Sequence, residues 1–178
     1  MKKIYILSFF VSFFVSGLHA QSQKLTFSIG PQVSVPTFNG INSTGIGGGF
    51  SIERFFSKKL TGFIDISLNY FNGNVLDHFK NDTIKGFTVM PVLAGAIYFF
   101  TDKFYLSGAA GIVIGLHNAG NHLALSPGTG ILIPISATSK IDLGLKLIGI
   151  PTGYSFSENN FLNKGGYSFL TFRIAYMF

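Results

Sequence analysis

Apolar side chains recur at every second position through most of the chain beyond its first 24 residues. The last segment shows the pattern clearly, because Leu170, Phe172, Ile174, Tyr176 and Phe178 alternate with Thr171, Arg173 and Ala175. A period of two places the apolar residues on one face of an extended strand and the remainder on the other face. The pattern therefore predicts β-strands that each have one apolar face and one smaller or more polar face.

Eight alternating segments follow one another, and they predict eight strands. They cover residues 25–35, 45–53, 60–70, 87–99, 104–116, 123–135, 141–147 and 170–178. In the fourth segment the alternation predicts an outward apolar face and a small inner face. The outward set is Phe87, Val89, Leu93, Ile97 and Phe99, and the inner set is Thr88, Met90, Ala94, Ala96 and Tyr98.

Proline residues interrupt the pattern at four places inside these segments. They are Pro31, Pro91, Pro127 and Pro134. Proline has no amide N–H, so it removes a donor that a continuous sheet would use. We expect a β-bulge or a shortened strand at each of them.

The connections between segments alternate in length. Short links cover residues 57–59, 101–103 and 138–140, and longer polar loops lie near 36–44, 72–83, 118–121 and 151–164. Short turns and both termini on one side, with long loops on the other, are typical of an outer-membrane barrel. A soluble β-sandwich would present polar outward faces, whereas these are Leu, Ile and Phe. The predicted fold is an all-β, eight-stranded antiparallel up-and-down transmembrane β-barrel.

The first 20 residues have the composition of a secretory signal. Lys2 and Lys3 precede an apolar run from Ile4 to Val15, and Ala20 ends a small-residue exit. The apolar run is shorter than the roughly 20 residues that a membrane helix needs. We expect residues 1–20 to be a cleaved signal peptide and residues 21–178 to be the outer-membrane barrel. The sequence contains no cysteine, so it predicts neither a lipoprotein anchor nor disulfides.

Five charged residues have inward parity in the predicted barrel. They are Glu53, Asp65, Asp142, Lys146 and Arg173. Because an unpaired buried charge is very unfavourable, we expect Lys146 and Arg173 to meet the carboxylates across the lumen. Such a lumen charge network either holds a closed barrel in shape or forms a polar gate, and the first interpretation is favoured because eight strands leave room only for side chains.

These residues resemble the small eight-stranded outer-membrane β-barrel family, the OmpA-like and OmpX-like barrels often described as porin-family proteins. The resemblance covers the signal, the alternating strands, the short turns and the aromatic C-terminus. It implies that Phe172, Ile174, Tyr176 and Phe178 form the signal that the barrel assembly machinery recognises. We expect a monomer in the outer membrane, and the distribution of lysines indicates contact with its lipids and with lipopolysaccharide.

Aromatic residues are expected near the membrane interfaces, where tryptophan is common in this family but absent from this sequence. The candidates are Tyr70, Phe71, Phe99, Phe100, Phe104, Tyr105, Tyr167 and Tyr176. The formal charge of +6 includes Lys2 and Lys3, and lysines also lie in the short turns. We interpret this basic character as attraction to anionic lipid headgroups rather than to nucleic acid.

Candidate catalytic and metal-binding residues are few. His117, His122 and Ser126 allow a nucleophile and a base to be imagined, but no motif of a lipid A-modifying barrel enzyme is present. Two histidines without a third ligand are weak evidence for a metal, and no phosphate-binding loop appears. We expect no catalysis, cofactor or metal. The acids Asp77, Asp82 and Glu158 fall in loops without a telling spacing.

The favoured function is a structural or surface-interaction protein with a closed or very narrow lumen. Loops with embedded aromatics, among them Phe38 and Tyr154, are candidates for an extracellular ligand. The first alternative is a minor pore for ions or small solutes. The second is a lipid A-modifying barrel enzyme.

Overall fold

The computed structural model describes residues 25–37, 44–72, 86–116, 120–151 and 167–178. The expected signal peptide, His78, His117 and most residues of the long loops lie outside these ranges. No helix among the described residues is long and apolar enough to cross a membrane. The eight strands are β1 (Leu25–Pro36), β2 (Gly45–Phe55), β3 (Leu60–Phe71), β4 (Phe87–Phe99), β5 (Phe104–Leu116), β6 (Gly120–Pro134), β7 (Lys140–Ile150) and β8 (Tyr167–Met177).

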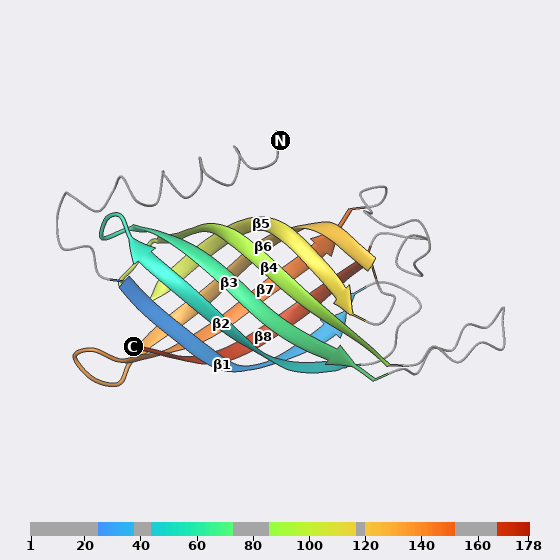
Figure 1. Ribbon diagram of the computed structural model, residues 1–178. Coiled ribbons are helices and arrows are strands. Elements are labelled where there is room, and N and C mark those ends of the chain that lie inside the picture. The colour runs from blue at the N-terminus through green and yellow to red at the C-terminus, as the bar shows by residue number, and fades with distance from the viewer. Residues whose placement is uncertain (1–24, 38–43, 73–85, 117–119, 152–166) are drawn as a thin grey trace, which may run out of the picture.

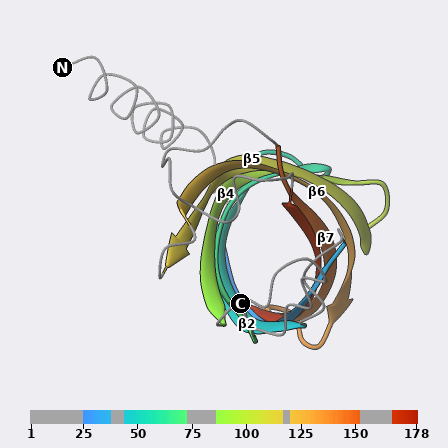
Figure 2. The same ribbon diagram turned by 90° about the vertical axis from the view of Figure 1, so that its right-hand side faces the viewer.

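Each strand pairs antiparallel with the next, and β8 pairs with β1 to close a barrel. The strands run obliquely to the barrel axis and form a complete ring (Figures 1 and 2). Two reciprocal backbone hydrogen bonds of 2.9 Å, between Phe27 and Phe178, extend the closing seam to the last residue. The predicted eight-stranded antiparallel barrel is therefore confirmed.

Leucine, isoleucine and aromatic side chains cover the outside of the barrel. Leu125 remains 58 % exposed and Ile46 64 %, although both are apolar. The outward residues predicted for the terminal strand are all exposed. In β1 and β3 the exposed ones include Ile29, Val33, Ile66 and Leu68. A surface of this kind is unfavourable in water, and it matches the apolar band of a membrane barrel.

The predicted orientation of the fourth strand is wrong. Phe87, Val89, Leu93, Ile97 and Phe99 are buried inside the barrel, and Ala94, Ala96 and Tyr98 face outward. Direct partners on adjacent strands share a face, and Leu93 pairs with the inward Asp65. Alternation alone missed this orientation because both faces of β4 are apolar or small.

Pro31, Pro91 and Pro127 cause neither a bulge nor a strand end, which corrects the expectation from the sequence, whereas at Pro134 the strand ends, one residue before the predicted end. At Pro31 the pairing of β1 with β8 is interrupted, but the same register resumes on both sides of the gap. The β3–β4 pairing is interrupted in the same way at Pro91, and the β6–β7 pairing at Pro127. Each proline keeps its pairing with the strand on its other side, so the strands remain long. Pro134 ends β6, paired with Lys140.

Three tight turns join β2 to β3, β4 to β5 and β6 to β7, at the barrel end that also carries the C-terminus (Figure 1). We call this the turn end and the opposite one the loop end. In each turn one side-chain hydroxyl accepts hydrogen bonds from two backbone N–H groups. The accepting hydroxyls belong to Ser57, Thr101 and Ser136 respectively. The third turn covers residues 135–139, slightly earlier than the predicted 138–140.

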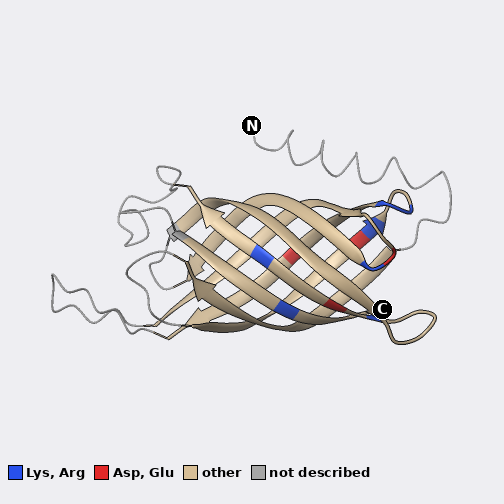
Figure 3. Ribbon diagram, turned by 180° about the vertical axis from the view of Figure 1, so that it is seen from behind, with Lys and Arg blue, Asp and Glu red and all other residues tan. Residues whose placement is uncertain are grey.

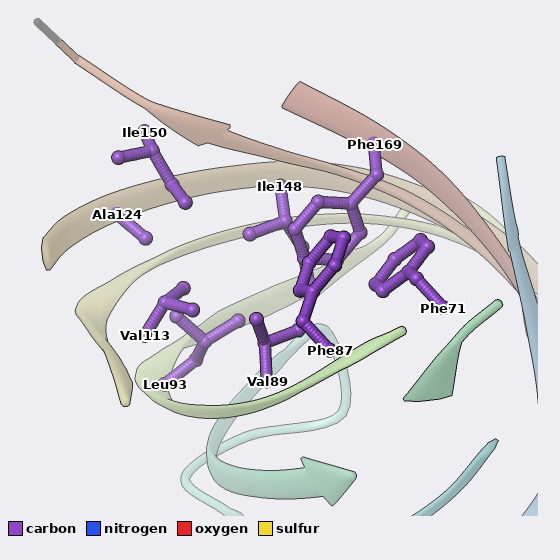
Figure 4. Packing of buried hydrophobic residues seen from close by; sticks show 9 residues of the cluster. All are labelled: Phe71, Phe87, Val89, Leu93, Val113, Ala124, Ile148, Ile150 and Phe169. Carbon is purple, nitrogen blue, oxygen red and sulfur yellow. The ribbon is translucent and has the colours of Figure 1, made fainter. Parts of the chain in front are cut away.

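Two apolar clusters fill the interior at different heights. The loop-end cluster contains Phe71, Phe87, Val89, Leu93, Val113, Ala124, Ile148, Ile150 and Phe169 (Figure 4). The Phe71 and Phe87 rings stack at a centroid distance of 5.0 Å, and Phe169 meets Phe71 edge-on at 5.5 Å. The turn-end cluster contains Ile97, Phe99, Tyr105, Leu132 and Met177, with Phe55 and Phe63 packed against them. The polar residues of the interior lie largely between these clusters.

Candidate functional site in the barrel interior

Four of the five predicted lumen charges meet in one network. Lys146 Nζ lies 2.7 Å from Asp65 Oδ1, and Arg173 Nη1 lies 2.6 Å from Asp65 Oδ2. Arg173 Nη2 also donates to Asp142 Oδ2 at 3.1 Å. Since Asp65 is on β3 while its two partners are on β7 and β8, these ion pairs cross the lumen. Figure 3 shows blue and red segments, the positions of basic and acidic residues, in the middle of the barrel wall.

Glu53, the fifth predicted residue, occupies a different position. It is buried and points inward from β2, but its Oε2 atom has no hydrogen-bond partner. Its Oε1 accepts a long hydrogen bond of 3.4 Å from the Ser51 hydroxyl. The structure thus brings Asp65, Asp142, Lys146 and Arg173 together, and Glu53 lies beside them without an ion pair to any described residue.

Tyr105 joins the network, although the sequence analysis placed it at a membrane interface. Its hydroxyl donates to Asp142 Oδ1 at 2.7 Å, and its side chain is buried. The tyrosine side chain reaches across β6 to Asp142 on β7 because its register partners there are Gly130 and Gly144. A Cβ atom on Gly130 would collide with the tyrosine hydroxyl, and one on Gly144 would crowd it. Its inward parity, shared with Ser107 on β5, was the signal that would have revealed it.

Uncharged polar side chains form a second group of hydrogen bonds in the lumen, nearer the loop end. Gln32 Nε2 donates to Asn69 Oδ1 at 2.8 Å, and the Ser34 hydroxyl donates to the same oxygen at 3.0 Å. Ser34 also shares a 2.9 Å hydrogen bond with Thr171. Gln32 reaches Asn69 over Gly47, which lies between them in register. These residues were not singled out in the sequence, where a polar residue at inward parity was the available signal.

A small cavity lies next to the ion pairs. Its volume is about 40 Å³, and Glu53, Asp65, Asp142, Lys146 and Arg173 all line it, together with apolar residues such as Phe99 and Leu132. A space of this size holds a few water molecules. It is much smaller than the several hundred Å³ usual for the site of a small organic ligand.

The residues of the imagined catalytic arrangement are not brought together. His122 and Ser126 both point inward from β6, but four residues along one strand place them roughly 13 Å apart. His117 lies outside the described residues. Among the residues that the structure describes, no group of three acidic, histidine or cysteine side chains has the arrangement of a metal site.

The predicted assembly residues Phe172, Ile174, Tyr176 and Phe178 all point outward from the terminal strand and are exposed. The Phe178 ring lies 5.9 Å from Tyr176 and 6.1 Å from Phe27, measured between ring centroids. The prediction that Phe71, Phe99 and Tyr105 lie at the membrane interfaces is wrong. Phe71, Phe99 and Tyr105 are buried in the lumen, whereas Tyr70 is exposed on the outside.

No protein-family model and no curated protein sequence matches this chain. Solved structures do. Neisserial surface protein A has a TM-score of 0.64 at 14 % identity, and the match covers 88 % of this chain and 98 % of that one. Ail, the attachment invasion locus protein of Yersinia pestis, has a TM-score of 0.56 at 14 % identity, covering 89 % and 100 %. Ail is an outer-membrane protein, and this structure of it contains the heparin analogue sucrose octasulfate.

This chain has the fold of a small outer-membrane β-barrel. An identity of 14 % carries the similarity no further than the fold, because unrelated functions share such barrels. What the barrel does must therefore be argued from its own residues.

Proposed function

We propose that this protein is an integral outer-membrane β-barrel with a lumen closed by its own side chains and a structural or surface-interaction role. The proposal includes removal of residues 1–20, a monomeric state, and membership of the OmpA-like and OmpX-like group. We propose no catalytic activity for it. The exposed apolar belt supports a place in lipid, and the filled interior supports the closed lumen.

One observation carries the closed lumen: the paired charges lie between two apolar clusters. An ion entering from the loop end meets the stacked Phe71 and Phe87 rings before it reaches Arg173. Beyond the cavity it meets Phe99 and Leu132. The side chains of both clusters are apolar and offer an ion no ligands in exchange for its water, which makes passage along them strongly unfavourable.

The surface role rests on the long connections at the loop end. Neisserial surface protein A and Ail show that this fold can serve as a surface or attachment protein, and Ail accommodates a sulfated sugar. In this chain the corresponding proposal is a ligand held by the loops at residues 38–43, 73–85 and 152–166. We place no part of this role in the barrel interior.

Planar-bilayer recordings of the folded barrel test the closed lumen. We expect no resolved conductance steps in 1 M KCl from the unaltered protein or from Lys58→Gln, a control for an exposed charge at the turn end. The minor-pore alternative predicts reproducible steps whose ion selectivity changes in Arg173→Gln or Lys146→Gln and not in Lys58→Gln. Such steps would overturn the closed lumen.

A further inference from the structure

Two neighbouring turns at the turn end carry a group of exposed basic and aromatic residues. We call this group the basic aromatic patch; it consists of Lys58, Lys59, Lys103, Phe56, Phe100 and Phe104. The two turns lie side by side, because the Phe99 N–H at the end of β4 donates to the Lys59 carbonyl at 2.9 Å. The two halves of the patch therefore lie next to each other. Figure 3 shows Lys and Arg segments gathered in the turns at this end.

Side-chain hydroxyl groups hold the backbone of both turns in place. Ser57 Oγ accepts the N–H of Lys59 at 3.2 Å and of Leu60 at 3.0 Å. Thr101 Oγ1 accepts the N–H of Lys103 at 3.3 Å and of Phe104 at 2.9 Å. Since both turns are fixed in this way, little backbone entropy would be lost when the lysines bind a partner.

The aromatic residues set the depth of the patch in a membrane. Phe56, Phe100 and Phe104 are each about half exposed, at 50 %, 49 % and 49 %. Aromatic side chains at the rim of a barrel lie at the boundary between hydrocarbon and headgroups. The lysines are one to three residues farther along the turns, so their ammonium groups lie at the level of the headgroup phosphates.

Among the described residues of the turn end, the exposed lysines are concentrated in these two turns. Asp102 is the one acidic residue in the two turns, against three lysines. The third turn, residues 135–139, contains no charged residue, and Lys140 after it is half-buried. A uniform ring of charge would attract any anionic surface, whereas a local group of three ammonium ions beside aromatic rings fits a single headgroup region.

We propose that the basic aromatic patch binds the phosphate of an anionic phospholipid in the periplasmic leaflet. This inference rests on the proposed function, because the short turns of an outer-membrane barrel face the periplasm. Lysine ammonium groups bind phosphate as charged hydrogen-bond donors. Peptidoglycan also carries negative charge, but contact with it gives no role to the exposed phenylalanines at the level of the bilayer.

Spin-labelled lipids measure the preference directly. The full barrel is reconstituted in phosphatidylcholine vesicles with a trace of spin-labelled phosphatidylglycerol or phosphatidylcholine, and the protein-restricted fraction of each is compared. We expect a several-fold preference for phosphatidylglycerol at low salt, falling towards one in K58Q/K59Q/K103Q. The preference also falls in 1 M salt, where the screening length is about 3 Å. K58R/K59R/K103R retains it, because the charge is unchanged.

The matched control is K80Q/K85Q/K164Q, which removes three charges from the loop side of the chain. A preference that the control loses as fully as K58Q/K59Q/K103Q reflects overall charge and overturns the patch. A preference for phosphatidylglycerol that is unchanged in K58Q/K59Q/K103Q also overturns the patch. The patch is likewise overturned if that variant keeps its lipid preference and loses only binding to peptidoglycan sacculi. A barrel that fails to enter vesicles contradicts the proposed function instead.

Discussion

Asp65 and Glu53 are two buried carboxylates of the same lumen, yet their surroundings differ. Asp65 receives Lys146 on one oxygen and Arg173 on the other. Glu53 has one oxygen without a partner and a weak contact to Ser51 on the other. A buried charge without partners is unfavourable, whereas removal of a paired charge strands its partners. The same change, from acid to amide, should therefore affect stability in opposite ways at these residues.

We expect Asp65→Asn to lower the free energy of unfolding by about 3–5 kcal/mol, because it leaves two buried cations without their shared carboxylate. Glu53→Gln should be neutral or stabilising, since it removes a charge without an ion-pair partner. Urea unfolding of the barrel in lipid vesicles measures both. Asp102→Asn, in an exposed turn, is the control and should change stability by less than about 0.5 kcal/mol. Equal destabilisation by Asp65→Asn and Glu53→Gln would contradict the assigned pairing.

At the scale of the strand, the sequence predicted most but not all of the barrel. Alternation identified eight strands because a two-faced strand needs residues of two kinds, as in β3, where Asp65 and Asn69 alternate with Ile66 and Leu68. It failed at β4 because neither face of that strand is polar. Orientation there is fixed by pairing with β3, which is a long-range property of the closed sheet.

The charged residues of the interior could be predicted from the sequence, but their individual contacts could not. Parity identified the inward charges, and the need to pair buried charges indicated that they would meet. Parity does not reveal which cation reaches which carboxylate, because register and strand tilt decide that. The effect of Pro31 was also unpredictable: its missing donor interrupts a ladder with one neighbour, and pairing with the other neighbour maintains the register.

The terminal strand gives a prediction about assembly. Phe178 and Phe104 are outward phenylalanines with similar exposure, 52 % and 49 %. If the C-terminal aromatic is a recognition signal, as the family resemblance implies, Phe178→Ala should reduce the amount of barrel in the outer membrane several-fold. Phe104→Ala, which removes the same ring elsewhere, should not. Immunoblots of outer-membrane fractions measure this.

Both variants should refold equally well from urea into detergent, because the Phe178 backbone hydrogen bonds to Phe27 do not depend on the ring. Equal membrane levels for the two variants would argue against a special role for the terminal residue. A refolding defect confined to Phe178→Ala would show instead that its ring stabilises the seam.

For the molecule as a whole, everything depends on closure between β1 and β8. Gly30 lies at this seam, where a Cβ atom would collide with the Ile174 carbonyl on β8. The pairing of β1 with β8 is already interrupted at Gly30 and Pro31, so few backbone hydrogen bonds hold the two strands together there. Gly48, paired with Pro31 on β2, faces outward, and a Cβ on it would meet one atom at an ordinary 3.5 Å. The two glycines therefore make a matched pair for testing closure.

Closed barrels resist detergent until heated, so boiled and unboiled samples migrate differently in electrophoresis. We expect the unaltered protein and Gly48→Ala to show this shift with the same midpoint temperature. Gly30→Ala should lower the midpoint or abolish the shift, because the added methyl group forces β1 away from β8 where only glycine fits. Both variants carry the same chemical change on neighbouring strands, so a difference between them reports on the seam. If Gly30→Ala shifts at the same temperature as Gly48→Ala, the close approach of β1 to β8 at this position is wrong.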